Sequence, residues 1–175
     1  MVARIDVRYW HGHAYYFLGE IDIIAGRTKA AVPRLRESLR HLEDCGDLSC
    51  WAGAMRALSL SHLRLGQSED AKATIAAVLR RTSPLPMPER AVPRALALAA
   101  RLLLDTGQAD RAAVIIGSAT AANGDAFLTS ELPRFETMAE EVQDRLGRDA
   151  SEKLGEGASL DMAGLLVSAV AWLQE

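Results

Sequence analysis

Three glycines recur along the chain at nearly constant spacing, and this repeat constrains the fold more than any other feature. Gly26, Gly66 and Gly107 lie 40 and 41 residues apart. Five residues after each glycine stands an alanine, and apolar residues recur on both sides at steps of three and four. Such steps are typical of the buried face of an amphipathic helix. Each glycine is therefore predicted to end one helix shortly before a second begins.

The residue types within the repeat fit this interpretation. Glycine enters the left-handed backbone region without steric cost, so it suits the end of a helix. The small alanines, Ala31, Ala71 and Ala112, are expected where the second helix lies close against the first. Thr28 and Ser68 are predicted N-caps of two of the second helices.

The full pattern predicts paired helices followed by a closing set. The pairs are expected at 3–25 with 28–44, 48–65 with 68–82, and 88–106 with 109–123. The proline-rich stretch 83–88 is predicted to be a loop between units. Further helices are expected near 131–146, 149–155 and 159–173, the last with Ser159 as its N-cap. Residues 1–124 would form the repeat array, and 125–175 would close the same domain.

The first unit carries a recognisable pattern of residue types. It reads Tyr15-x-x-Leu18-Gly19, followed after Gly26 by Ala31-x-x-x-Leu35. This resembles the tetratricopeptide pattern, which repeats a helix–turn–helix unit. The expected fold is all-α: a tetratricopeptide-like solenoid of helical hairpins, with about three repeats of ~40 residues and a C-terminal helical cap.

Two stretches resemble a larger family. Residues 107–119 are similar to a Gly-x-x-x-x-Ala-Ala-x-Leu-Leu-Gly-Ala-Ala segment, and residues 145–163 to the ending of the same region. The family comprises large bacterial LuxR-type and AfsR-type transcriptional regulators with an ATPase module, a tetratricopeptide-like array and a DNA-binding domain. The resemblance implies a module for protein interaction and signal reception, or alternatively a domain that binds a small-molecule inducer. This chain would be a fragment or a stand-alone relative of such a regulator.

No enzyme motif accompanies the repeat. The sequence has no phosphate-binding loop, no Gly-x-Ser-x-Gly elbow and no His-Glu-x-x-His. His11 and His13 stand two apart and would leave a helix in different directions, and Cys45 and Cys50 lack the two-residue gap of a zinc pair. We therefore expect no catalysis, no cofactor and no metal, with the cysteines as structural thiols.

The candidate binding surface is the concave side of the array, lined by the first helix of each pair. Among the residues that tetratricopeptide offsets place there, the possible ligand groove comprises His13, Tyr16, Glu20, Arg56, Arg64, Arg94 and Arg101. Guanidinium groups bind carboxylates in a bidentate manner, so the four arginines would suit an anionic protein or peptide. Two alternatives remain open. Nearby acids such as Glu20 and Asp105 could neutralise the patch, or it could be an ordinary solvated face.

Charge and hydropathy limit the other partners. The formal net charge is −3, which gives no reason to expect direct nucleic-acid binding. No apolar run approaches the ~20 residues that a membrane span needs. A cytoplasmic location is expected, and a homodimer remains an option.

Overall fold

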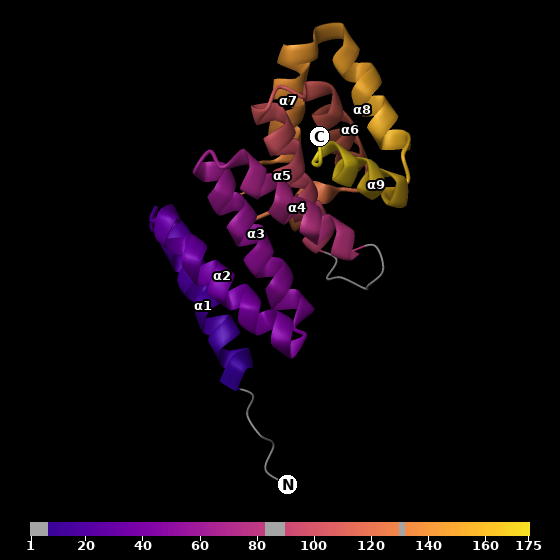
Figure 1. Ribbon diagram of the computed structural model, residues 1–175. Coiled ribbons are helices and arrows are strands. Elements are labelled where there is room, and N and C mark those ends of the chain that lie inside the picture. The colour runs from indigo at the N-terminus through magenta and orange to yellow at the C-terminus, as the bar shows by residue number, and fades with distance from the viewer. Residues whose placement is uncertain (1–6, 83–89, 130–131) are drawn as a thin grey trace. The chain divides into compact units, whose positions relative to one another are not determined.

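The computed structural model describes residues 7–82, 90–129 and 132–175 (Figure 1). Within these ranges the chain is helical and contains no strand, which confirms the all-α prediction. No helix in the described part is both long and apolar enough to cross a bilayer. The predicted loop at 83–88 and the predicted helical residues 3–6 lie outside the described residues.

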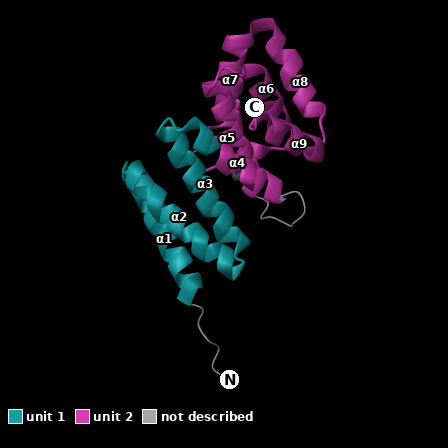
Figure 2. Ribbon diagram, viewed as in Figure 1, with its two compact units in different colours: residues 1–71 teal, residues 72–175 magenta. Residues whose placement is uncertain are grey.

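The chain divides into two compact units, Met1–Ala71 and Lys72–Glu175 (Figure 2). The first contains α1 (Val7–Ile24), α2 (Thr28–Cys45) and α3 (Leu48–Arg64). Helix α4 (Ser68–Thr82) begins in the first unit and continues into the second. The second unit also contains α5 (Ala91–Asp105), α6 (Ala109–Ala121), α7 (Phe135–Leu146), α8 (Ala150–Ser159) and α9 (Met162–Trp172). Short 3₁₀ helices occupy Gly124–Phe127 and Gly147–Asp149.

The three repeated glycines form the same turn. Gly26, Gly66 and Gly107 have φ angles of 74°, 69° and 81°. In each turn the residue after the glycine donates its backbone N–H to the carbonyl five residues earlier, at 2.7, 2.9 and 2.8 Å. This is the Schellman arrangement, which satisfies carbonyls that the end of a helix would otherwise leave open. The predicted role of these glycines is confirmed.

The repeated alanines are also where the pattern predicts them. Ala31, Ala71 and Ala112 have no exposed surface at all. In the first unit α1, α2 and α3 contact one another, and glycines bring α1 close to α2. A Cβ atom on Gly19 would lie 2.6 Å from the Leu35 side chain. The Ser38 hydroxyl also donates to the Gly12 carbonyl at 2.7 Å, which ties the two helices together.

The predicted helix caps are wrong. Thr28 and Ser68 are the first residues of α2 and α4 instead of the residues before them. Arg27 holds the N-cap position of α2, and its side chain makes no capping bond. Ser159 is the last residue of α8 instead of the first before α9. The cap of α9 is Asp161, whose Oδ1 accepts from the Gly164 N–H at 2.6 Å. Asp161 replaces Ser159 because Leu160 is extended and shifts the helix start, and because a carboxylate also complements the positive end of the helix dipole.

Helix α6 is the centre of the second unit. It contacts α5, α7, α8 and α9, and the nine buried residues along it include Ala112, Ile115 and Ile116 with no exposed surface. A helix that is apolar on all sides has to be surrounded in this way. Its closest neighbour is α8. A Cβ on Gly117 would lie 2.0 Å from the Leu154 carbonyl oxygen, and one on Gly157 would lie 2.0 Å from the Val114 carbonyl oxygen.

This contact predicts different outcomes for two glycines of α8. Gly157→Ala should lower the free energy of unfolding by at least ~1–3 kcal/mol, because backbone atoms cannot yield as a flexible side chain can. Gly155→Ala is the matched control, since a Cβ there meets nothing within 4 Å. That change should be neutral or stabilise by up to ~1 kcal/mol through helix propensity. Urea unfolding measures both, and equal effects would refute the proposed α6–α8 contact.

Candidate functional site

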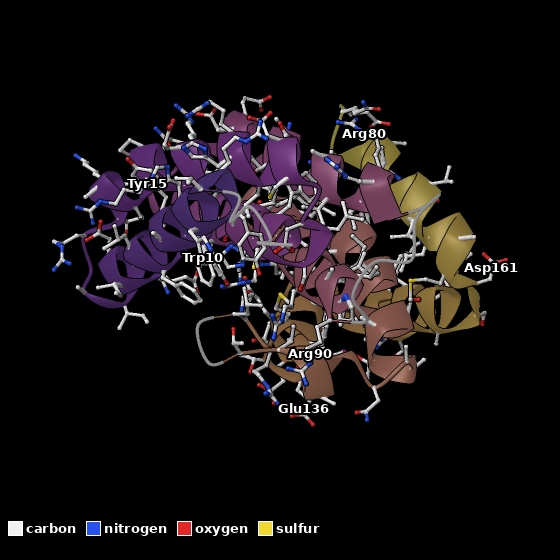
Figure 3. The ribbon with its side chains drawn as sticks, turned by 90° about the horizontal axis from the view of Figure 1, so that it is seen from below. Trp10, Tyr15, Arg80, Arg90, Glu136 and Asp161 are labelled. Carbon is white, nitrogen blue, oxygen red and sulfur yellow. The ribbon has the colours of Figure 1, made fainter. Side chains whose placement is uncertain are left out.

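The outer face of α1 carries a continuous row of apolar side chains. Its members stand at alternating steps of three and four, and we call them the α1 stripe: Val7, Trp10, Ala14, Phe17, Ile21 and Ile24. All six are exposed, with Trp10 60%, Phe17 56% and Ile24 73% accessible. Figure 3 labels Trp10 on this helix, with Tyr15 projecting in another direction.

The opposite face of α1 is the one that packs inside the unit. Its buried residues are Gly12, Gly19, Asp22 and Ile23. Helix α1 is thus apolar on the outside and closely packed on the inside. Single exposed apolar side chains are common on proteins, but a contiguous row of large ones is typical of an interaction surface.

The first-unit residues of the predicted groove lie on α1 and α3, where two of them form an ion pair. Arg56 is only 8% exposed, and its Nη2 donates to both Glu20 carboxylate oxygens at 2.7 and 2.8 Å. Burial acts to lower the pKa of Arg56, but the charge of Glu20 and the neighbouring Tyr16 raise it overall. Burial, reinforced by Glu20, raises the pKa of the Tyr16 phenol. Arg56 is therefore charged and neutralised internally.

Arg101, in the second unit, is also engaged by acids of the chain. Its guanidinium donates to Glu141 at 2.5 and 3.1 Å and to Asp105 at 2.6 and 3.0 Å. These bonds, chiefly the one with Glu141, raise the pKa of Arg101 and lower that of Glu141. Arg64 is exposed at the end of α3, and Arg94 is half-buried in α5. For Arg56 and Arg101, the neutralising acids are internal.

His13 of the predicted groove belongs to a polar cluster within the first unit. Its Nδ1 lies 2.8 Å from the Tyr9 carbonyl oxygen, which can only accept, so Nδ1 carries the hydrogen. Its Nε2 lies 2.9 Å from Cys50 Sγ and 3.3 Å from Asp47 Oδ2. Asp47 Oδ1 caps α3 by accepting from the Cys50 N–H at 3.0 Å. Sequence analysis considered the histidines and the cysteines as separate pairs, whereas the fold joins one member of each.

The environment of Cys50 favours the protonated form of its thiol. Burial, followed by the negative charge of Asp47, raises the pKa of Cys50 to about 11. Only the thiolate is a good nucleophile, so a raised pKa slows alkylation at neutral pH. Both cysteines of the chain are free thiols.

This shift predicts a pH profile for Cys50. In a Cys45→Ser variant kept in chelator, iodoacetamide should react slowly at pH 8 and the rate should rise steeply toward pH 11. The reason is that the thiol stays protonated until the pH nears its raised pKa. Mass spectrometry of the alkylated peptide measures the rate. The same variant unfolded in urea supplies the control and should react ~100-fold faster at pH 8. Equal rates for folded and unfolded chain would contradict the assigned environment.

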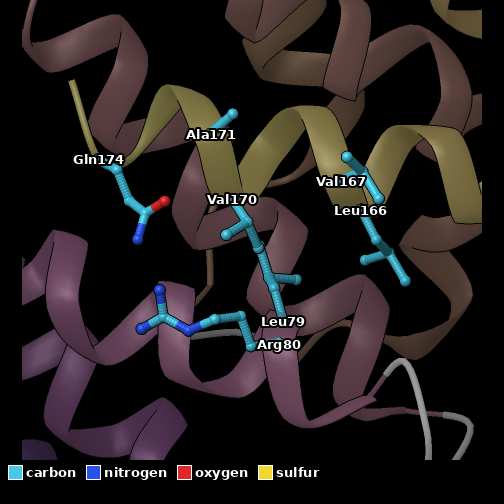
Figure 4. Close-up of a pocket in the computed structure, with 7 residues that line it drawn as sticks. All are labelled: Leu79, Arg80, Leu166, Val167, Val170, Ala171 and Gln174. Atoms are coloured by element: carbon cyan, nitrogen blue, oxygen red, sulfur yellow. The ribbon is translucent and has the colours of Figure 1, made fainter.

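A hollow lies within the second unit, between α4 and α9. Its volume is about 390 Å³. Figure 4 shows Val170 directed toward Leu79 and Arg80, with Gln174 at one end and Leu166 at the other. The lining is mostly apolar, with one guanidinium and one amide group. Its volume is within the range of small-molecule sites.

The α1 stripe was missed by the sequence analysis for an identifiable reason. The repeat pattern predicts that Tyr15 and Leu18 define the apolar face of this helix and assigns no role to the six stripe residues, but Tyr15 and Leu18 are themselves 36% and 43% exposed. A signal was present, because α1 carries two apolar faces and a single hairpin partner can cover only one.

Comparison of the chain with protein-family models, with curated proteins and with solved structures finds no match.

Proposed function

We propose that this chain is a tetratricopeptide-like protein-interaction module that receives a signal within a bacterial transcriptional regulator of the LuxR/AfsR type. The α1 stripe is the observation that carries the interaction part of the proposal. The regulator family rests on the resemblance of residues 107–119 and 145–163. The structure adds a supporting detail: Gly117 and Gly157, one from each stretch, form the close α6–α8 contact.

The spacing of the α1 stripe identifies the kind of partner. Alternating steps of three and four over the 18 residues from Val7 to Ile24 span about 26 Å of helix. Such a row packs best against a second helix, with the side chains of each helix filling the spaces between those of the other. The two helix axes then cross at an angle near 20°. The proposed partner is therefore an apolar-faced α-helix of another polypeptide, lying along α1.

The size of the α1 stripe is sufficient for a specific contact. Five large side chains that are about half exposed offer roughly 500–600 Å² on this side alone. A partner helix would contribute a similar area, which brings the total to about the 1,000–1,200 Å² that the smallest specific interfaces bury. The stripe contains no charged residue, so shape and apolar area would select the partner and salt would have little influence.

Site-specific photo-crosslinking tests the α1 stripe in the native host. A benzophenone amino acid replaces Phe17 in one variant and the exposed α2 residue Arg36 in a control. We expect the Phe17 position to crosslink one polypeptide through an apolar helix face, and the Arg36 position to give none of it. Adding Ile24→Ser should reduce the yield at least tenfold. Because Ile24 is 73% exposed, that change should alter stability by less than ~0.5 kcal/mol.

The other outcomes are equally informative. No crosslink at Phe17, or equal crosslinking at Arg36, would refute the α1 stripe as a docking surface. A crosslink only to a second copy of this chain would replace the heterologous partner by a homodimer.

The hollow between α4 and α9 favours a second candidate function, the binding of a small-molecule inducer. Its apolar lining with Arg80 at the rim fits an amphiphilic anion. Decanoate serves as the probe in calorimetry. We expect Arg80→Ser to weaken decanoate binding about tenfold, in line with the loss of a charged hydrogen bond. The control is Arg36→Ser, which removes an exposed arginine elsewhere. Equal weakening by both variants, or no binding to the wild-type chain, would exclude this second function.

A further inference from the structure

The cluster of His13, Asp47 and Cys50 has the composition and geometry of a metal site. One ligand atom from each side chain lies within 4.8 Å of the other two. The three atoms are an imidazole nitrogen, a carboxylate oxygen and a sulfur. This donor set is typical of zinc, because imidazole and thiolate both favour it over magnesium or calcium. All three residues belong to the first unit.

The hydrogen-bond pattern leaves the three donor atoms facing one another. His13 Nδ1 donates to the Tyr9 carbonyl, so when the ring is neutral its Nε2 lone pair faces Cys50 Sγ and Asp47 Oδ2. The single thiol proton can bridge only two of these atoms. When that proton lies between Cys50 Sγ and His13 Nε2, Asp47 Oδ2 is left without a hydrogen from this group at 3.3 Å from His13 Nε2. A cation between the three atoms would satisfy all of them.

We propose that His13 Nε2, Asp47 Oδ2 and Cys50 Sγ bind a zinc-class transition-metal ion, with a fourth position open to water or another ligand. Binding releases the Cys50 thiol proton to solvent and forms a metal–thiolate bond, without any change of oxidation state. The proposal is independent of the function assigned to the α1 stripe and of the hollow between α4 and α9.

The distances fit a tetrahedral site with little adjustment. Zinc bonds of about 2.0–2.1 Å to nitrogen and oxygen put those two atoms about 3.3 Å apart, which is the observed separation of His13 Nε2 and Asp47 Oδ2. A zinc–sulfur bond of about 2.3 Å puts sulfur and nitrogen about 3.5 Å apart. The Cys50 Sγ to His13 Nε2 distance is 2.9 Å, so the sulfur has to move by roughly 0.6 Å. Rotation of the Cys50 side chain supplies such a movement.

The surroundings already orient the ligands as in known metal sites. Metal-binding histidines commonly donate their other ring nitrogen to a backbone carbonyl, as His13 does to Tyr9. The Tyr9 ring lies against the His13 imidazole, with centroids 4.1 Å apart, and restricts its rotation. Asp47 is fixed because its other oxygen caps α3. The side chains of His13 and Asp47 are 15% and 18% exposed, which leaves a path for an ion.

Cobalt(II) is the direct probe, since cobalt–thiolate bonds absorb in the near ultraviolet. The full chain without a histidine tag is reduced, freed of metal and titrated with Co²⁺ alone. We expect one ion per chain with a thiolate charge-transfer band that added Zn²⁺ removes. Cys45→Ser is the matched control and should keep the band. Cys50→Ser should abolish it, and His13→Gln should weaken binding at least ~100-fold.

A second measurement separates binding from misfolding. Far-ultraviolet circular dichroism should show all three variants folded without metal, and Zn²⁺ should raise the melting temperature of wild type and Cys45→Ser but not of Cys50→Ser. Absence of a thiolate band at saturating Co²⁺ would overturn the proposal. So would a band that survives Cys50→Ser and disappears in Cys45→Ser.

Discussion

Close packing of helices at glycine is the constraint on which much of this structure depends. Gly12 and Gly19 allow α1 to lie against α2, and Gly117 and Gly157 allow α6 to lie against α8. In α1 the consequence reaches the surface. Because glycines occupy two of the four buried positions of the inward face, most bulky apolar residues of this helix lie on its other faces. The tight internal packing of α1 and its exposed stripe are therefore two results of one arrangement of residues.

Local features of the fold could be predicted because short-range chemistry determines them. Where one helix ends and the next begins within a few residues, the chain needs a residue with left-handed backbone angles. Gly26, Gly66 and Gly107 supply these angles. The buried alanines follow from the same repeat. The cap at Asp161 was less accessible to prediction, since Ser159, Asp161 and the intervening Leu160 are all compatible with a helix start. Backbone conformation at Leu160 decides between them.

The candidate sites depend on contacts that no sequence interval reveals. Cys50 and His13 are 37 residues apart and meet only because α3 returns alongside α1. The arginines illustrate the opposite problem. Their positions on α3 and α5 were predictable, but whether a guanidinium is free or neutralised depends on which acid the fold brings near. Glu141 is 40 residues from Arg101 and outside the repeats that the spacing defines. Charge pattern alone could not identify it as the partner.

The contrast between two of the three tryptophans of this chain has a practical consequence. Trp51 is buried, at 4% exposure, whereas Trp10 stands near the N-terminal end of the α1 stripe and is largely open to water. Indole fluorescence shifts to shorter wavelength when water is excluded. A protein lying along α1 would therefore alter the emission of Trp10 while leaving that of Trp51 unchanged. The chain thus carries a built-in optical reporter for occupancy of its exposed helix, with an internal reference in the same molecule.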